Sequence, residues 1–277
     1  MSEDKIRLDM LVVKKQLAMS REKAREYILT GKIYVNGRVE KKCGLKIKED
    51  SHIEMIGEII PYVSRGGLKL EKAIKDFNID LKNKVCLDIG ASTGGFTECM
   101  LLNGAKKVFA IDVGRNQLAE KLRNNPKVVS MEETNIRDIN LDDIKELSDF
   151  ASIDVSFISL DKVIPHVLPL LKESGEVMAL IKPQFEAGKG KVSKKGVIKS
   201  AKLHEEIILN IISLLKENNI NIIGLNYSGI KGPNGNIEYL INFTKNITKL
   251  SNFNLSSVAD IVKLAHEKLN SEELWKT

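Results

Sequence analysis

The chain has 277 residues, enough for two domains at the usual size of roughly 150 residues each. Its apolar content of 43% and charged content of 29% are those of an ordinary globular protein and exclude a disordered chain. No apolar run reaches the ~18 residues of a membrane-spanning helix, and the charged start lacks the apolar core of a signal peptide. We therefore expect a cytoplasmic protein without membrane contact. The cysteines form no CxxC pair and the histidines no HExxH pattern, so we expect neither a disulfide framework nor a bound metal.

Basic residues are concentrated near the amino terminus. Residues 7–48 hold twelve Lys or Arg against four acidic residues, a net charge of +8. The rest of the chain holds 31 basic and 33 acidic residues, a net charge of −2. Such a stripe is expected of a protein that binds a phosphate backbone, although charge alone fits a solvated surface equally well.

The first sixty residues predict two short helices and a compact β segment. An apolar stripe predicts a helix over 7–16, and Ser20 is a suitable N-cap for a second helix that ends at Gly31. Asn36-Gly37 is a strong hairpin turn, and a further strand is indicated at 52–55. The segment is therefore a small α+β domain.

This segment resembles the S4 RNA-binding module. The resemblance rests on Arg7-Leu-Asp9, Ser20-Arg-Glu-Lys-Ala24 and Gly31-Lys-Ile-Tyr-Val35-Asn36-Gly37; a generic α/β mini-domain is the alternative. It implies RNA contacts from the basic residues of the segment, namely Arg7, Lys14, Arg21, Lys23, Arg25 and Lys32. We assign this domain to residues 1–60 and a linker to 61–63, because Pro61 interrupts regular structure.

Strand and helix signals alternate after the linker. We predict strands at 85–89, 107–111, 127–131, 150–155, 176–181, 221–226 and 237–243, and helices at 96–102, 160–171 and 201–217. The alternation predicts an α/β fold with a doubly wound, mostly parallel sheet over residues 64–246. The last two strands are too close in sequence for a helical crossover, so the last one should pair antiparallel at the end of the sheet. Residues 247–277 form a tail with a helix near 255–270 that packs on the body.

A glycine-rich turn, Gly90-Ala-Ser-Thr-Gly94-Gly95, follows the first of these strands, and Asp112 lies 22 residues past Gly90. Glycines let the backbone approach a ligand and the acid can take two ribose hydroxyls, so the pattern indicates a nucleoside cofactor. The pattern alone does not separate NAD from S-adenosylmethionine. The spacing lacks the turn that clasps a pyrophosphate, however, and Asp88 suits a cationic amino-acid end.

The stretch from Asp88 to Gly94 also resembles the first motif of class I methyltransferases, a Rossmann-like fold, which implies S-adenosylmethionine. We expect the cofactor at Asp88, Gly90, Ala91, Ser92, Gly94, Gly95, Asp112, Val113, Asn135 and Asp154.

Four charged residues should meet at the carboxyl edge of the sheet, namely Lys69, Asp154, Lys182 and Glu238. Methyl transfer to a hydroxyl needs an in-line nucleophile and a route for its proton, and alignment supplies roughly 7–11 kcal/mol in favourable cases. The order Lys-Asp-Lys-Glu resembles the catalytic tetrad of the FtsJ-like ribose 2′-O-methyltransferases. With the S4 module in front, residues 5 to about 243 resemble the TlyA family, described both as rRNA 2′-O-methyltransferases and as hemolysins. The resemblance implies ribosomal RNA as partner and a cytidine ribose as target.

Lys182 is the residue we expect to activate the ribose hydroxyl. Desolvation and Lys69 would lower its pKa, whereas Asp154 and Glu238 oppose that shift, so both a general-base role and electrostatic stabilisation of the oxyanion remain open. The lysine-rich loop 188–199 follows it. This loop is either a solvated surface or a phosphate contact. We expect further RNA contacts at Arg65, Lys189 and Lys191. Phe185 is expected in the core rather than stacked on a base.

Two other functions compete with methyl transfer. A pore-forming cytolysin would fit the other description of the family, but the sequence contains no spanning helix, secretion signal or series of amphipathic hairpins. A non-catalytic ribosome-assembly factor would keep the nucleoside fold, and the complete tetrad disfavours it. The expected activity is therefore S-adenosylmethionine-dependent 2′-O-methylation of rRNA.

Overall fold

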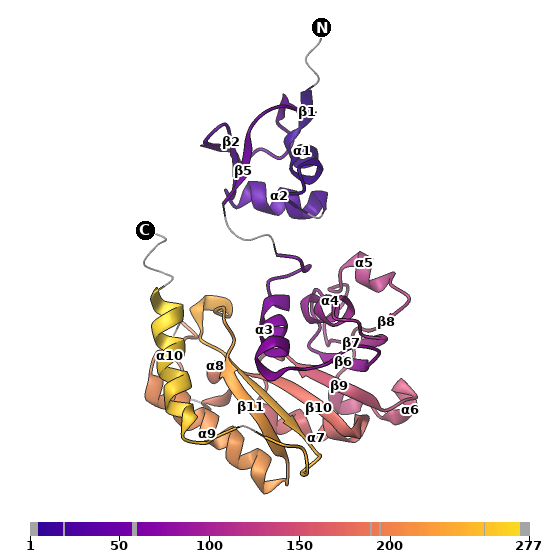
Figure 1. Cartoon of the computed structure of the whole chain (residues 1–277), viewed down its shortest axis with the longest axis vertical. Helices are drawn as coiled ribbons and strands as arrows, with labels where there is room; N and C mark the ends of the chain where they lie inside the picture. The colour runs from indigo at the N-terminus through magenta and orange to yellow at the C-terminus, as the bar shows by residue number, and fades with distance from the viewer. Residues whose placement is uncertain are drawn as a thin grey trace. The chain divides into compact units, whose positions relative to one another are not determined.

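The structure is a computed structural model (Figure 1). It describes residues 5–18, 20–56, 60–188, 190–193, 195–251 and 253–271. The chain divides into two compact units, Met1–Pro61 and Tyr62–Thr277. No helix among these described residues is long and apolar enough to cross a membrane.

The first unit contains the predicted helices and hairpin. Its elements are β1 (Lys5–Arg7), α1 (Leu8–Lys14), α2 (Arg21–Leu29), β2 (Ile33–Val35), β3 (Arg38–Val39), β4 (Lys46–Lys48) and β5 (Ile53–Met55). Ser20 is the N-cap of α2, because its side chain accepts a hydrogen bond of 3.2 Å from the amide of Lys23. Asn36 and Gly37 have φ of +50° and +76°, as a tight turn between β2 and β3 requires. These predictions are confirmed.

The second unit is built on a seven-stranded sheet in the order β11-β12-β10-β9-β6-β7-β8. The strands are β6 (Val85–Ile89), β7 (Lys107–Ile111), β8 (Val128–Met131), β9 (Ser148–Ile153), β10 (Leu171–Ile181), β11 (Asn221–Tyr227) and β12 (Tyr239–Thr244). The helices are α3 (Gly67–Phe77), α4 (Gly95–Leu102), α5 (Glu120–Arg123), α6 (Leu141–Ile144), α7 (Ile164–Val167), α8 (Pro183–Glu186), α9 (Ala201–Glu217) and α10 (Ser257–Ser271). The run β8-β7-β6-β9-β10 is parallel, which confirms the mostly parallel sheet.

The last strand is antiparallel, as predicted, but it does not lie at the end of the sheet. β12 pairs with β11 on one side and with β10 on the other, where Tyr239 lies opposite Ile181. Because the connection after β11 is short, β11 and β12 form a hairpin. The other edge of β12 then forms its hydrogen bonds with β10. The edge position therefore belongs to β11.

The predicted helix over 160–171 is wrong. The segment forms three short pieces instead, the 3₁₀ turn Leu160–Lys162, helix α7 and the 3₁₀ turn Leu168–Leu170, and β10 already begins at Leu171. Pro165 and Pro169 explain the break, because each lacks the amide that a continuous helix would need.

Helices cover both faces of the sheet. Alternate strand residues such as Leu87 and Ala151 share one large apolar core with residues of α9 and α10, while α3 and α4 pack on the sheet without joining that core. The yellow helix α10 lies beside the orange helix α9 in Figure 1. Val258, Val262 and Ala265 bring α10 into the core, so the tail helix packs on the body as expected.

The segment predicted as a linker belongs to the second unit from Tyr62 onward. Tyr62 is buried, and its ring lies so close to Gly67 that a Cβ there would come within 2.3 Å of it. The amide of Val63 donates a hydrogen bond of 2.6 Å to Glu98. These contacts fix the approach to α3.

A buried ion pair connects the first turn of α3 with the start of β12. Nζ of Lys69 lies 2.5 Å from Oε2 of Glu238, and the two side chains are 7% and 0% exposed. The other carboxylate oxygen accepts a long hydrogen bond of 3.5 Å from Gln184. Since both charges have left bulk water, each one depends on the other for its stabilisation.

We expect Lys69→Met to lower the free energy of unfolding by about 3–5 kcal/mol, because Glu238 is left buried and uncompensated. Glu238→Met should cost a similar amount for the complementary reason. The double variant should be markedly more stable than the sum of the two losses predicts. Urea unfolding of the four proteins measures the coupling, and strictly additive losses would contradict an energetic pair.

Candidate active site

A cavity of about 350 Å³ lies at the carboxyl edge of the parallel strands. It opens beside β6, where the strand order reverses from β7 on one side to β9 on the other, the place at which doubly wound sheets bind their ligands. Its walls come from the turn after β6, the loops after β9 and β10, the entry to α3 and the segment before β12. The lining residues are Ser64, Arg65, Gly66, Lys69, Gly90, Ala91, Ser92, Thr93, Gly95, Phe96, Asp154, Ser156, Lys182, Gly232 and Pro233.

The glycine turn is in backbone contact with the loop after β9. Gly90 has φ of +83°, and a Cβ at this position would lie 2.4 Å from the carbonyl oxygen of Asp154. Gly94 has φ of +95°, and its missing side chain makes room for Leu122 of α5. Gly90 therefore shapes the cavity floor, whereas Gly94 serves the packing of α5 and does not line the cavity.

Asp88 lies below the turn and is fully buried, so it supports the cavity without lining it. Its carboxyl accepts hydrogen bonds of 2.6 Å from the Thr97 hydroxyl and 3.0 Å from the Ser152 hydroxyl. Burial raises the pKa of Asp88 to about 6, against the opposing effect of these hydrogen bonds. Thr97 and Ser152 were not predicted from the sequence, where single hydroxyl residues in apolar segments are inconspicuous.

Asp112 lies beside the turn, at the end of β7. Its carboxylate accepts the amide of Ser92 at 2.8 Å and the amide of Gly114 at 2.7 Å, which holds two loops together. Val113 is 71% exposed. Asn135 caps a 3₁₀ turn and accepts a hydrogen bond of 3.1 Å from the amide of Arg137. None of Asp112, Val113 and Asn135 lines the cavity.

The four charged residues form two ion pairs at the same edge. Besides Lys69 and Glu238, Nζ of Lys182 lies 2.5 Å from Oδ1 of Asp154 and donates a hydrogen bond of 3.2 Å to Ser156. Asp154 directly follows β9, and Lys182 directly follows β10. The topology therefore gathers the predicted tetrad. Ser156 was not predicted, although it stands only two positions past Asp154.

We expected Phe185 in the core, but the structure does not place it there. It lies half-buried on the short helix α8, with its ring 4.9 Å from that of Phe157, centroid to centroid. Phe157 is 90% exposed, and Nζ of Lys182 lies 5.9 Å from the Phe185 ring centroid. A helix of four residues is too short to bury one face, so the aromatic pair stays at the surface beside Lys182.

In the first unit a buried carboxylate organises two of the predicted RNA contacts. Asp9 is fully buried and accepts hydrogen bonds of 3.0 and 2.9 Å from Arg7 and one of 3.1 Å from Arg21. The hydrogen bonds from Arg7, which have the largest effect, and from Arg21 lower the pKa of Asp9 to about 2. Both guanidinium groups remain about half exposed, so Asp9 holds them in a defined orientation toward solvent.

The remaining predicted contacts of this unit differ in their surroundings. Lys14 and Lys23 form exposed ion pairs with glutamates. Among the residues that the structure describes, Arg25 and Lys32 form no ion pair; Lys32 lies with its Nζ 5.4 Å from the ring centroid of Tyr27. Arg25 and Lys32 are therefore the predicted cations most available to an external anion.

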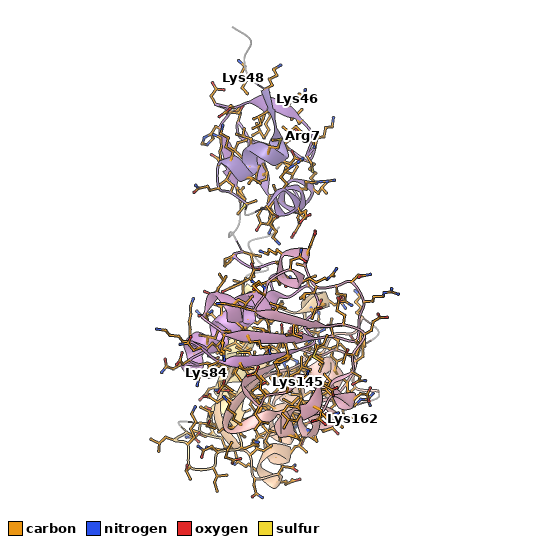
Figure 2. All side chains as sticks on the ribbon, turned by 90° about the vertical axis from the view of Figure 1, so that its right-hand side faces the viewer. Arg7, Lys46, Lys48, Lys84, Lys145 and Lys162 are labelled. Carbon is orange, nitrogen blue, oxygen red and sulfur yellow. The ribbon has the colours of Figure 1, made fainter. Side chains whose placement is uncertain are left out.

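The small sheet of β1 and β4 adds basic residues that we did not single out. Its register places Arg7 opposite Lys46 and Lys5 opposite Lys48. Figure 2 labels Arg7, Lys46 and Lys48 on this sheet. Directly opposed like charges weaken a strand pair. Strands of three residues carry too little alternation to be recognised in the sequence.

Three predicted RNA contacts belong to the second unit. Arg65 lines the cavity next to Ser64. Lys191 is exposed and lines a neighbouring cavity. Lys189 lies outside the described residues.

Comparisons with known proteins agree with this architecture. Residues 62–245 match the model of the FtsJ-like methyltransferase family, and residues 6–53 match the S4 domain. The chain is 47% identical over 239 residues to Hemolysin A of Brachyspira hyodysenteriae, covering 86% of this chain and 99% of that protein. It is 38% identical over 236 residues to the 16S/23S rRNA (cytidine-2'-O)-methyltransferase TlyA of Mycobacterium tuberculosis, covering 85% and 88%.

A solved structure of a candidate hemolysin from Streptococcus thermophilus is 40% identical, with a TM-score of 0.77 over 98% of this chain and 99% of that one. The similarity therefore extends over both units and not only over the catalytic one. The order of domains and the extent of the matches lead to one conclusion. The chain belongs to the TlyA family, in which an S4 domain precedes an FtsJ-like methyltransferase domain.

Proposed function

We propose that this protein transfers the methyl group of S-adenosylmethionine to a ribose 2′-hydroxyl of ribosomal RNA, with a cytidine as the target. The observation that carries the proposal is the pairing of Lys182 with Asp154 and of Lys69 with Glu238 around one cavity beside a glycine turn. The related TlyA is named for the same reaction. Because the proposed substrate is ribosomal RNA, we also propose that the protein acts in the cytoplasm. Another relative bears the name Hemolysin A, but the charged cavity favours methyl transfer.

The residues around the turn fit S-adenosylmethionine. Gly90 and Ala91 line the cavity where the turn lies against the backbone of Asp154. The Asp112 carboxylate lies outside that lining but is held at the turn by the amide of Ser92, and we assign the ribose hydroxyls of the cofactor to it. The carboxylate of Asp154 lines the same cavity and can face a cationic group. When bound, this cofactor supplies a methyl group that is already activated for transfer.

Lys182 is the residue we assign to the ribose hydroxyl. Its ion pair with Asp154 holds Nζ 2.5 Å from Oδ1 at the cavity wall, and a general-base role requires that Nζ give up its proton before methyl transfer. That amine would accept the proton of the 2′-hydroxyl, while bound S-adenosylmethionine would supply the methyl group and leave as an uncharged thioether. Ser156 holds the amine in place. The Lys69–Glu238 pair ties α3 to the segment that enters β12, and Lys69 also lines the cavity.

We assign RNA affinity mainly to the S4 unit. Its exposed cations include Arg7, Arg21 and Arg25, and no tetrad-like cluster accompanies them among the described residues of that unit. Phosphate contacts of this kind position an RNA and make its binding dependent on salt. Chemistry and affinity are then divided between the two units.

Asp112→Ala should weaken binding of S-adenosylmethionine by about 1–3 kcal/mol, because the ribose hydroxyls lose their acceptor. Isothermal calorimetry on the full chain measures the change. Asp142→Ala, on the exposed start of α6, is the matched control and should bind like the wild type. Unchanged affinity in Asp112→Ala, or no binding by the wild type, would refute the cofactor assignment.

Lys182→Ala should lower single-turnover methylation of an rRNA fragment by about 10²–10⁴-fold while cofactor and RNA still bind. Lys182→Arg should not restore the rate, since a guanidinium stays protonated and cannot accept the proton. Partial activity in the arginine variant would instead assign an electrostatic role. Lys162→Ala, at an exposed lysine labelled in Figure 2, should retain the full rate. Near-normal turnover in Lys182→Ala would remove Lys182 from the site.

Arg25→Ala and Lys32→Ala should each weaken rRNA binding and reduce the slope of log affinity against log salt by about one unit. Cofactor binding should be unaffected, because the S4 unit holds none of the residues that line the cavity. Lys162→Ala again serves as the control for a lost surface charge. Equal salt slopes in all four proteins would contradict the assignment of RNA affinity to the S4 unit.

A further inference from the structure

The two loops that carry the Lys182–Asp154 pair are joined at a second place, by the side chain of Glu186. One loop leaves β9 at Asp154 and ends at Ser159, and the other leaves β10 at Lys182 and continues into α8. Glu186 is the last residue of α8. Its carboxylate accepts hydrogen bonds of 2.5 Å from the Ser159 hydroxyl and 3.0 Å from the amide of Leu160. The carboxylate therefore bridges the two loops.

This carboxylate also supplies the cap that a 3₁₀ turn would otherwise lack. Leu160 is the first residue of the turn Leu160–Lys162, and the side chain of Ser159 before it forms no capping hydrogen bond. The amide of Leu160 has its acceptor in Glu186 instead, 26 positions further along the chain. Leu160 is buried, and a buried amide without an acceptor is costly. The end of the loop after β9 is therefore held in place by α8.

The start of the same loop is fixed as well. The amide of Asp154 donates a hydrogen bond of 2.9 Å to the carbonyl oxygen of Ile89 at the end of β6. Between the two anchors, Phe157 has φ of +64°, a conformation that a bulky side chain adopts only where its surroundings enforce it. Its ring contacts that of Phe185, the residue before Glu186. The loop is thus constrained at both ends and at its middle.

The bridge reaches Lys182 by two routes. The carbonyl oxygen of Lys182 accepts hydrogen bonds of 2.9 Å from the amide of Phe185 and 3.3 Å from the amide of Glu186, so α8 is attached to the backbone of Lys182. The other route runs through the side chain, because both partners of Nζ, Asp154 and Ser156, lie on the loop whose end Glu186 holds. A displacement of Glu186 would therefore change the surroundings of the ammonium group.

We propose that Glu186 is a positioning residue for methyl transfer, which holds Asp154 and Ser156 beside Nζ of Lys182 by bridging the two loops. The proposal rests on the proposed function, in which Lys182 meets the ribose hydroxyl. Glu186 does not line the active-site cavity, so it acts through Lys182 and not by contact with a ligand in that cavity. Alignment of the reacting groups accounts for much of the rate of such a transfer.

The first test measures single-turnover methylation of an rRNA fragment at saturating cofactor and RNA. Glu186→Ala removes both hydrogen bonds and should lower this rate by about 10–100-fold, while the affinities for cofactor and RNA do not change. Glu186→Gln should restore most of the rate, because its amide oxygen can accept from Leu160 and its amide nitrogen can donate to Ser159. Glu206→Ala, at an exposed position of α9, is the matched control and should keep the full rate.

Three results would overturn the proposal. A full rate in Glu186→Ala would remove the residue from the mechanism. A loss in Glu186→Gln as large as that in Glu186→Ala would assign the effect to the charge and not to the bridge. If Glu186→Ala does not fold, Ser159→Ala removes only one of the two hydrogen bonds and should lower the rate by about 2–10-fold. A full rate in Ser159→Ala would then contradict the bridge.

The second test observes the loops without the reaction, by NMR of the full chain labelled with isotope-enriched phenylalanine. The ring resonances of Phe157 and Phe185 are assigned by replacing each residue with leucine. In Glu186→Ala both sets should move toward the values of solvated phenylalanine, as the two loops separate. The buried rings of Phe109 and Phe243 should not respond, which shows that the fold is retained. Unmoved resonances of Phe157 and Phe185 would overturn the proposal.

The two tests distinguish failure of this proposal from failure of the proposed function. If the wild type transfers no methyl group while the Phe157 and Phe185 resonances move in Glu186→Ala, the methyltransferase proposal fails and the bridge between the loops stands. If the wild type methylates the rRNA fragment and Glu186→Ala does so at the same rate, the positioning role fails alone.

Discussion

The reversal of strand order beside β6 is the constraint on which the candidate site depends. β6 has β7 on one side and β9 on the other, so the connections that leave its neighbours diverge and open a crevice above their carboxyl ends. The crevice stays narrow because Gly90 lies against the carbonyl of Asp154, an approach that no residue with a Cβ would allow. The glycine turn and one half of the tetrad are therefore set by the same backbone contact.

Much of the fold could be predicted from the buried strands and from the turn residues that separate them. The mainly apolar runs at 85–89 and 107–111 predicted β6 and β7 with correct bounds, because parallel strands covered on both faces bury most of their side chains. The helix expected over 160–171 does not form as one piece, because Pro165 and Pro169 each lack the amide that a continuous helix needs. The position of β12 also could not be predicted, since the sequence encodes a hairpin but not which of its strands meets β10.

The charged residues of the site could be predicted from the sequence, but not which of them form ion pairs with one another. Strand ends identified Asp154 and Lys182, yet only the fold shows that they form one pair and that Lys69 and Glu238 form another. Asp9 gives a similar lesson for the S4 unit. In a charge count it merely reduces a basic stripe, whereas in the structure it is the buried acid that orients Arg7 and Arg21. The charge pattern gives only the number of charged side chains, whereas burial determines the structural role of each one.

The insertion of β12 between β10 and β11 has a consequence for the order of assembly. β11 is made first, but its place in the sheet does not exist until β12 has paired with β10. Glu238 directly precedes the same strand, so Lys69 on α3 has no partner until the residue 169 positions later has been synthesised. During synthesis on the ribosome, the sheet and the tetrad can close only after residue 244 has emerged, and a shorter nascent chain holds an unfinished edge and an unpaired lysine.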